Sequence, residues 1–422
     1  MKRNYIWMLS SKIALMVAAL VTAALINRAL GPELRGVLAE IQTWVALMVT
    51  CFGLSLDTAI YHFSNRELYP GKDSNQLATV IVMTLIYSSV ASLFILSVTH
   101  FKADIISSTT MKYVFLMVIL LVSTMFSSNL AVFYQARGRM VLSSVAGFLQ
   151  ALINVSLIGI AYYFSNLNLR LIVICLIVVQ VTGLLVFLIM GTRGQFLKGS
   201  FSLSLARDML GAGLKQHAAT VSTFVYTKIN QLILLKYCGE AQAGLFAVSL
   251  SLIMAAMVIP GTLQLVLYPR VLNYKDDWEI TLKTLGISCY LWGLLIVVAI
   301  LLARPILMIY GGVAFIDAVT SFRILLITAW LLPLSSMIAP YYVKKGAFIL
   351  ASSTAVFLAI ISIKLNIELI SRYGINGAAW ATSITTIIGF VIVILMLWYL
   401  GRRNPLKFLN IAYLANWRVK KD

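Results

Sequence analysis

Apolar runs long enough to cross a lipid bilayer occupy most of this chain. A helix rises 1.5 Å per residue, so about 20 apolar residues span the roughly 30 Å hydrocarbon core of a membrane. Among 422 residues, 61% of them apolar, twelve candidate spans lie at approximately 6–30, 40–63, 77–99, 113–134, 140–162, 170–191, 214–236, 244–268, 283–303, 323–342, 347–370 and 377–400. The sequence therefore predicts an all-α membrane protein with about twelve transmembrane helices.

The connections between these spans are short. The longest cover about 192–213, 269–282, 304–322 and the tail from 401, and each is too short to build a hydrophobic core of its own. This pattern argues against a soluble catalytic domain. The stretch from Ser200 to Lys215 mixes apolar and charged residues, which is typical of a helix lying on the membrane surface. We expect this helix to join two halves of the protein.

The net charge of +19 is distributed unevenly between the two sides of the membrane. With a cytoplasmic N-terminus, that side receives 21 of the 33 Lys and Arg residues. Positive charge accumulates in cytoplasmic loops of membrane proteins. We therefore expect both termini in the cytoplasm, and we attribute the basic residues to membrane topology rather than to nucleic-acid binding.

The two halves of the chain match at an offset of 208 residues. Gly31 falls on Gly239, and Gly138, after the fourth span, falls on Gly346, after the tenth. Each half then has six spans, and an even number gives the halves the same orientation in the membrane. The predicted parts are an N-terminal six-helix bundle at 1–191, a cytoplasmic amphipathic linker at 192–213, a C-terminal six-helix bundle at 214–400 and a basic cytoplasmic tail at 401–422.

Four short motifs follow one another over nearly the whole chain. They are Asn27 to Gly36 after the first span, Gly213 to Gln231 in the seventh, Pro305 to Gly311 before the tenth and Tyr373 to Ala379 before the twelfth. Together they resemble the polysaccharide transporter family, the Wzx-type flippases within the multidrug/oligosaccharidyl-lipid/polysaccharide exporter superfamily. Many members have Arg-x-Asp where this chain has Lys228-Ile229-Asn230, so the positive charge is kept and the acid is absent.

The resemblance implies a V-shaped pair of six-helix bundles, like those of multidrug exporters, with a central cavity that opens alternately to the two sides. It implies a substrate made of an oligosaccharide repeat unit on undecaprenyl pyrophosphate, for O-antigen, lipopolysaccharide or a similar surface polysaccharide. It also implies the bacterial inner membrane, no cofactor, contact with membrane lipids, and a polysaccharide polymerase and a chain-length regulator as candidate partners.

Polar residues inside the spans are the candidate site residues, because an ionisable group costs about 2.5 kcal/mol or more in hydrocarbon. Lys228 lies some 21 Å along the seventh span, at 1.5 Å per residue, and is poorly placed to reach either surface. At about 100° per residue it shares a polar face with Thr227, Asn230 and Gln231, as expected beside a wet cavity. The alternative is a lysine paired with a buried acid for structural reasons.

Two further lysines and one asparagine complete the predicted pyrophosphate or cavity site. Lys12 lies about six residues from the cytoplasmic end of the first span, so its side chain is also able to reach the membrane surface. This lysine shares a helix face with Asn27, and the resemblance implies that the first and seventh spans face each other across the cleft. Ammonium groups bind phosphate strongly in a low-dielectric site. Lys364, near the end of the eleventh span, is the third lysine of the set, and its side chain is also long enough to reach the membrane surface.

Asp57 in the second span is the main acidic candidate. It could pair with a lysine, coordinate a cation or carry a proton. The three histidines have no metal-ligand spacing, so we expect no metal site. The candidates for sugar contacts are Trp44, Tyr61, Tyr134, Gln135, Tyr226, Tyr268, Tyr341 and Tyr342. Aromatic residues also gather at membrane interfaces, which explains most of these positions equally well. Helix breaks are expected near Pro260-Gly261, Pro333 and Pro340.

Rival functions remain. A cation-coupled multidrug exporter of the same superfamily should display acids to attract cationic drugs, whereas the spans here contain more lysine than acid. A polysaccharide polymerase or another membrane enzyme needs a larger extramembrane loop with catalytic groups. A flippase without enzymatic activity is therefore the function that the sequence favours.

Overall fold

The structure is a computed structural model that describes residues 2–64, 73–101, 106–191, 199–261, 264, 271 and 277–415. These residues are almost entirely helical, and none of those described forms a strand. They fall into two compact units. Unit 1 contains Met1–Leu20 and Val225–Asp422, and unit 2 contains Val21–Phe224. These boundaries lie at different positions from those of the predicted bundles, since the start of the first helix packs with the C-terminal half.

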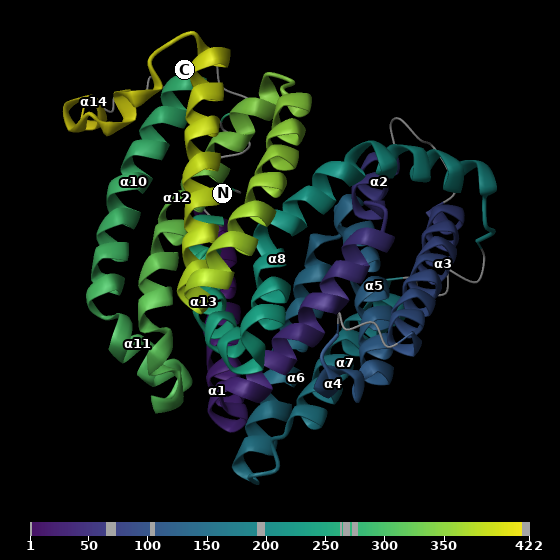
Figure 1. Cartoon of the computed structure of the whole chain (residues 1–422). Helices are drawn as coiled ribbons and strands as arrows, with labels where there is room; N and C mark the ends of the chain where they lie inside the picture. Colours follow the sequence, from purple (N-terminus) through teal and green to yellow (C-terminus); the bar gives the residue numbers. More distant parts are fainter. Residues whose placement is uncertain are drawn as a thin grey trace. The chain divides into compact units, whose positions relative to one another are not determined.

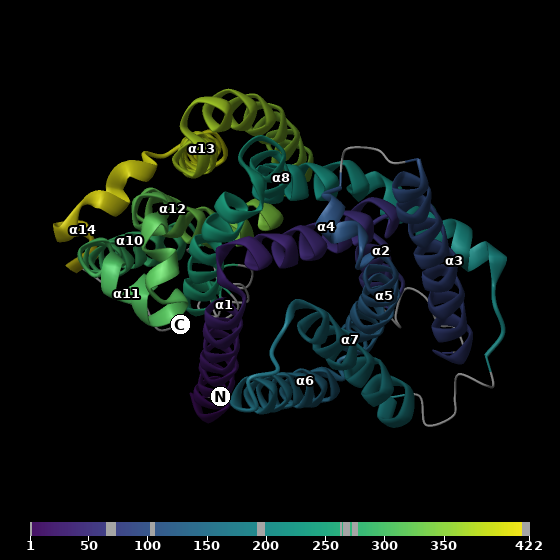
Figure 2. The same ribbon diagram turned by 60° about the horizontal axis from the view of Figure 1, so that its bottom comes forward.

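Unit 2 contains most of α1 (Lys2–Phe52), the short α2 (Leu56–Phe63), α3 (Asp73–His100), α4 (Ser108–Met111), α5 (Val114–Ala136), α6 (Met140–Tyr163), α7 (Leu169–Val186) and the π-helix η1 (Phe187–Gly191). Helices α1 to α7 are labelled in Figure 1. Helix α5 contacts α2, α3, α6 and α7, and Figure 2 shows this bundle from a second direction. The central position of α5 lets it contribute side chains to every cavity described below.

Unit 1 contains most of α8 (Leu203–Ala256), followed by α10 (Asp277–Leu301), α11 (Ala303–Gly311), the 3-10 helix η3 (Val313–Ala318), α12 (Val319–Lys344), α13 (Phe348–Gly401), the 3-10 helix η4 (Pro405–Leu409) and α14 (Ile411–Ala415). Residues 203–213 of the predicted surface linker form the first turns of α8. Residues 192–198 of the predicted linker lie outside the described residues.

Twelve membrane crossings follow from the helix lengths. Nine helices in the described residues are long and apolar enough to span a membrane. Three of them, α1, α8 and α13, have 51 to 54 residues and each contains one glycine with a non-helical backbone. A straight helix of that length would measure about 75–80 Å, far more than the bilayer core. Each therefore supplies two spans, and the predicted number of spans is confirmed.

The internal repeat is visible in the backbone. Gly31 and Gly239, which bend α1 and α8, have φ of 67° and 80° with ψ near 180°. Gly138 and Gly346, in the loops after α5 and α12, have φ of 74° and 66°. Backbone of this kind suits glycine, because a Cβ crowds the chain at positive φ. Both pairs are separated by the predicted offset, which confirms two six-helix halves with related folds.

The bends of α1 and α8 are each bridged by the amide side chain of a different residue. Asn27 Oδ1 accepts a hydrogen bond of 2.9 Å from Arg35 Nε across the bend of α1. Gln231 Nε2 donates one of 3.0 Å to the carbonyl oxygen of Ala243 across the bend of α8. The partners Arg35 and Ala243 occupy equivalent positions in the repeat, but Asn27 aligns with Leu235 rather than Gln231. Each half therefore bridges its bend with a different amide hydrogen bond.

The second span is broken, which the sequence analysis missed. Leu54 and Ser55 have φ of 48° and 52°, so the predicted helix at 40–63 divides into the end of α1 and α2. Gly213 of α8 lies directly against this break, since a Cβ there would be 2.3 Å from the carbonyl oxygen of Leu54. Ser55 Oγ also donates to Thr220 Oγ1 at 3.0 Å. The break thus lets the backbones of two distant segments approach closely.

The predicted proline breaks have mixed outcomes. Helix α8 ends at Ala256, with a turn at Met257, close to the expected break at Pro260-Gly261. The breaks predicted at Pro333 and Pro340 are wrong, because α12 continues through both. Each proline removes the N–H that would bond the carbonyl four residues earlier. Trp292 Nε1 donates to the freed carbonyl of Ala329 at 2.7 Å, and Gln264 Nε2 to that of Ser336 at 2.8 Å.

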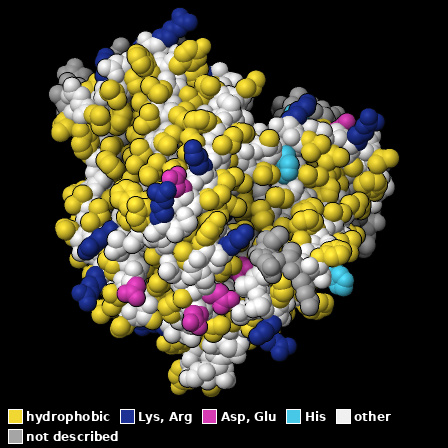
Figure 3. Space-filling model, viewed as in Figure 1, with side chains coloured by type: hydrophobic (Ala, Val, Ile, Leu, Met, Phe, Trp, Pro, Cys, Tyr) yellow, Lys and Arg dark blue, Asp and Glu magenta, His cyan; other side chains and the backbone are white. Residues whose placement is uncertain are grey.

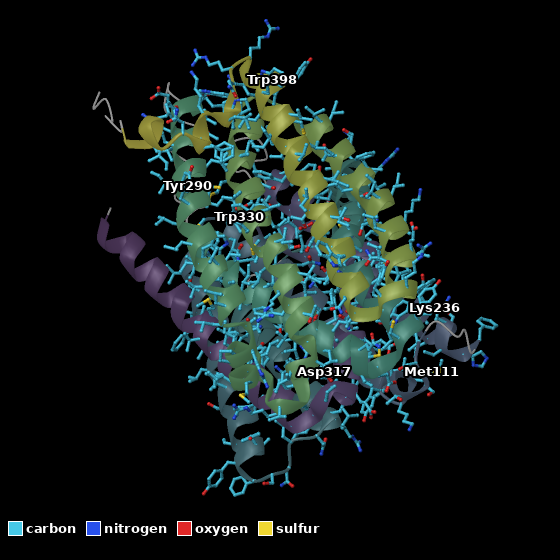
Figure 4. All side chains as sticks on the ribbon, turned by 60° about the vertical axis from the view of Figure 1, so that its left-hand side comes forward. Met111, Lys236, Tyr290, Asp317, Trp330 and Trp398 are labelled. Carbon is cyan, nitrogen blue, oxygen red and sulfur yellow. The ribbon has the colours of Figure 1, made fainter. Side chains whose placement is uncertain are left out.

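Each unit has its own apolar core and a lipid-facing surface. The core of unit 2 includes Ile60, Leu130 and Phe187. Figure 3 shows hydrophobic side chains over most of the visible face, as expected for helices that contact lipid. In Figure 4, Trp398 lies at one end of unit 1, and Lys236 and Asp317 lie toward the other. Aromatic and charged residues near helix ends fit membrane-spanning helices.

Candidate functional site

Lys228 lies on α8 between its start and the bend at Gly239, and its side chain is only partly exposed. The ion pairs among the described residues join lysines or Arg372 to Asp277, Glu279 and Glu368. None of them includes Lys228. The alternative of a buried structural ion pair therefore has no support within the described part of the chain.

The neighbours of Lys228 on the predicted polar face are packed inside unit 1. Asn230 is 1% exposed and donates through Nδ2 to Thr382 Oγ1 of α13 at 2.9 Å. Gln231 is 4% exposed and spans the bend of α8, as described above. Thr227 is partly buried. The polar face is thus shared between Lys228, which has no acidic partner among the described residues, and amides that are already hydrogen-bonded.

The remaining predicted phosphate-site residues lie in different environments. Asn27 is fully buried and accepts the bond from Arg35. Lys364 on α13 is exposed. Lys12 lies on α1 in unit 1, and its side chain is outside the described part of the chain. Asn27 therefore has a structural partner, whereas Lys364 is free of close packing.

Asp57 lines a cavity of about 220 Å³ within unit 2. The helix break places it in the first turn of α2, where the helix dipole favours negative charge. Its side chain is exposed, and no described Lys or Arg forms an ion pair with it. Ser128 and Asn129 of α5 and Thr220 of α8 are other polar lining residues. This carboxylate is therefore accessible, and its pairing with a lysine is not seen among the described residues.

A second cavity of unit 2, of about 420 Å³, lies between α5, α6 and α7. Its polar lining includes Ser127, Gln150, Asn154 and Gln180, none of which the sequence analysis singled out. Each helix contributes only a few polar residues, so the sequence of no single span indicates the cavity. The spacing of the polar residues along α6 does indicate it, because at about 100° per residue they lie opposite the exposed apolar residues of that helix.

The predicted sugar-contact residues divide into core and accessible groups. Trp44, Tyr134, Tyr341 and Tyr342 are all buried and belong to the packed interior. Tyr61 of α2 is 50% exposed, and its hydroxyl donates to Gln135 Oε1 of α5 at 2.9 Å, so these two residues lie together beside the second cavity. Tyr226 is partly buried, and Tyr268 lies outside the described residues.

Groups that could support metal or thiol chemistry are dispersed. Within the described residues, no cluster of three His, Cys, Asp or Glu side chains could hold a metal ion. The four cysteines are free thiols. The chemistry available in the two described cavities is hydrogen bonding by neutral groups, together with the Asp57 carboxylate. Lys228 of unit 1 is not among the lining residues of either cavity.

These helices and intramembrane polar groups define a multi-pass α-helical membrane protein. The chain is similar to an inward-facing multidrug resistance MATE family transporter of the MOP superfamily, with 13% identity, 92% of this chain and 96% of that chain covered, and a TM-score of 0.73. It is also similar to the lipid II flippase MurJ in an inward closed conformation, with 14% identity, 98% and 93% coverage and a TM-score of 0.64. The MATE transporter VcmN of Vibrio cholerae has 14% identity, 95% and 97% coverage and a TM-score of 0.66.

The chain belongs to the polysaccharide biosynthesis protein family, whose model matches residues 1–275. The resemblance inferred from the four motifs is thereby confirmed. No curated protein matches the chain. The solved structures establish the fold, which transporters and a lipid flippase share.

Proposed function

We propose that this protein is a flippase that moves undecaprenyl-pyrophosphate-linked oligosaccharide repeat units from the cytoplasmic to the periplasmic leaflet by alternating access. The glycan belongs to an O-antigen or a similar surface polysaccharide. Membership in the polysaccharide biosynthesis protein family and the fold shared with a lipid II flippase support this class of substrate. The protein moves the glycan without chemical change.

The observation that carries the proposal is Lys228, a partly buried lysine within a membrane-spanning helix and without a described acidic partner. An ammonium in hydrocarbon costs about 2.5 kcal/mol or more unless a counter-charge or water accompanies it. A pyrophosphate supplies that counter-charge, and lysine is a strong point-charge binder of phosphate. Lys228 therefore serves as the site that holds the anionic linkage of the substrate.

The membrane potential provides a driving force for this direction of transport. Moving one elementary charge across 100 mV is worth about 2.3 kcal/mol, so two negative charges leaving a negative interior gain about 4.6 kcal/mol. The bacterial inner membrane with both termini in the cytoplasm fits this direction and the basic residues on that side. A polymerase and a chain-length regulator would then act on the delivered glycan.

The test is translocation of a labelled undecaprenyl-pyrophosphate oligosaccharide in vesicles containing the purified protein. A membrane-impermeant glycosidase reports which leaflet holds the glycan. Lys228→Ala should lower the rate by an order of magnitude or more, while Lys228→Arg retains part of it. Lys236→Ala is the matched control, because Lys236 lies exposed near the end of the same helix segment, as Figure 4 shows. Normal flipping by Lys228→Ala would contradict the phosphate site, and no flipping of several glycans by the folded parent would contradict the function.

The exposure of Asp57 in a cavity supports one alternative function, that of a cation-coupled multidrug exporter. The carboxylate lines a cavity and is accessible, as needed to attract a cationic drug or carry a proton. The discriminating assay is efflux of ethidium from vesicles with an imposed pH gradient. Ethidium transport by the parent, lost in Asp57→Asn and retained in Lys228→Ala, would replace the flippase proposal.

A further inference from the structure

The cavity between α5, α6 and α7 is unusually polar for the interior of a membrane bundle. Eight of its thirteen lining residues carry a hydroxyl or amide, and none is charged. They include Ser127, Ser128, Gln135, Gln150 and Asn154. Polar side chains within membrane segments are costly to expose to lipid and mark pathways or binding sites. The uniform neutrality of the lining separates this cavity from the two charged candidates, Lys228 and Asp57.

Helix α6 turns its polar and apolar sides in opposite directions. Its exposed apolar residues include Val141, Phe148 and Leu152, which recur at helical spacing on one side. The cavity residues Gln150 and Asn154 lie on the other side, at about 100° per residue. The exposed apolar side points out of the unit 2 bundle, so the polar side is directed into it. This arrangement excludes a chance polar patch on the lipid-facing surface.

The wall of the cavity contains an ordered amide and an unsatisfied one. Gln150 Nε2 donates to the carbonyl oxygen of Val179 at 3.1 Å, and Gly183 leaves room for it, because a Cβ there would be 2.4 Å from Nε2. Asn154 Oδ1 is buried and accepts no hydrogen bond within the described structure. A buried acceptor without a donor costs about 1–3 kcal/mol. A ligand or water that donates a hydrogen bond would remove this cost.

An aromatic ring forms another part of the wall. Phe187 opens the π-helix η1 and stacks on Tyr134, with ring centroids 5.7 Å apart. π-Helical turns are rare and occur frequently at functional sites. Phe187 is also part of the buried core of unit 2, so its ring borders the cavity without offering a free face. The groups available to sugar hydroxyls are therefore the hydroxyl and amide side chains of the lining.

The composition of the lining selects among the parts of a lipid-linked oligosaccharide. The described lining contains no cation, which argues against the pyrophosphate, and its eight polar residues argue against the polyprenyl chain. The volume is within the usual range of ligand pockets, about 300–1,000 Å³. We propose that this cavity of unit 2 is a subsite for uncharged sugar residues of the transported glycan, bound through their hydroxyl and acetamido groups. This inference rests on the proposed flippase function for the identity of the glycan.

Thiol protection tests the subsite without requiring transport. The four native cysteines are replaced by alanine, and Asn154→Cys or Leu152→Cys is added to the full chain in detergent micelles. The probes are chitotriose, maltotriose and mannotriose, with trigalacturonic acid and inorganic pyrophosphate as anionic comparisons. At least one neutral trisaccharide should slow labelling of Asn154→Cys by a water-soluble thiol reagent several-fold. Labelling of Leu152→Cys, on the exposed apolar side of the same helix, should not change.

Two results would overturn the subsite. One is the same labelling rate of Asn154→Cys with and without all three neutral trisaccharides. The other is equal protection by trigalacturonic acid or pyrophosphate, because an uncharged lining with selective sugar contacts should not favour them. Asn154→Leu is suitable for the accompanying transport assay, since the unbonded Oδ1 makes no described contribution to folding.

The two assays separate failure of the subsite from failure of the flippase. If Asn154→Leu flips the glycan as fast as the parent does, the result contradicts the subsite and leaves the proposed flippase function supported. Protection of Asn154→Cys by a neutral trisaccharide without flipping of any glycan by the parent supports the subsite and contradicts the function. Slower flipping by Asn154→Leu, with an unchanged melting temperature, supports both.

Discussion

The indole Nε1–H of Trp292 donates to the carbonyl oxygen of Ala329, the oxygen that Pro333 deprives of its backbone donor. A helix inside a membrane has no water to satisfy such an oxygen, so a neighbouring side chain must do so. The bond joins α10 to α12 and explains why α12 continues through a proline. The same logic applies to Gln264 and the carbonyl of Ser336.

Trp292→Phe should therefore destabilise unit 1 by about 1–3 kcal/mol, the usual cost of an unsatisfied buried acceptor. Trp330→Phe is the control. Its indole donates to Cys289 at 3.1 Å, but that carbonyl lies inside α10, where the helical backbone also supplies a donor. Denaturant unfolding in micelles should show the larger loss for Trp292→Phe. Equal losses would mean that packing, rather than the proline-freed carbonyl, dominates.

Gly239→Ala should cost about 1–3 kcal/mol, because its φ of 80° with ψ of 180° belongs to a region that only glycine occupies easily. A Cβ at Gly239 would meet no atom within 4 Å, so backbone strain is the only source of the loss. Gly147→Ala, in the middle of α6 and also without close neighbours, should be neutral or stabilising by about 0.5–1 kcal/mol. Thermal unfolding of the two variants measures the difference. A similar effect of both would contradict the glycine-specific bend.

Glu40→Gln should loosen the segment around α4. Glu40 is fully buried and accepts hydrogen bonds from Ser107 N at 2.9 Å, Ser107 Oγ at 2.6 Å and the Thr110 hydroxyl. The amide of glutamine replaces one acceptor with a donor, at a cost of about 1.5–3 kcal/mol for a charge-assisted bond. Hydrogen exchange at 106–111 should become faster. Glu33→Gln, exposed on the same helix, should leave it unchanged, and no change in either variant would rule out the pinning role.

Gly183→Ala should disturb the neutral cavity while the fold remains intact. Its Cβ would lie 2.4 Å from Gln150 Nε2 and 2.6 Å from Ser127 Oγ, both of them atoms of movable side chains. Displacing Gln150 should weaken protection of Asn154→Cys by neutral trisaccharides several-fold. Gly159→Ala, which meets no atom within 4 Å, is the matched control on α6. Undiminished protection in Gly183→Ala would show that Gln150 does not take part in binding.

The spans and the repeat could be predicted because each depends on local chain properties. Span length follows from apolar runs, and the glycines at 31, 239, 138 and 346 mark positions where the backbone itself demands glycine. The break at Leu54 and Ser55 lies against Gly213, which is far away in sequence, so no local pattern revealed it. The continuity of α12 likewise depends on donors from other segments.

The candidate site was predicted less completely. A polar helix face can line a wet cavity or contact polar residues of a neighbouring helix, and the spacing of Asn230 and Gln231 is the same in both cases. The structure gives these amides partners in Thr382 and Ala243. The neutral cavity was missed for the converse reason, since it exists only where three sparsely polar helices converge. Whether Lys228, Lys12 and Lys364 bind phosphate stays a prediction.

The glycine pairs at equal offsets give the two halves the same backbone turns. Tyr134 and Ser127 also align with Tyr342 and Ser335 at this offset. The amides beside them do not repeat, since the counterparts of Gln135 and Gln150 are Val343 and Leu358. The two halves thus share their turns, while these amides occur in only one of them.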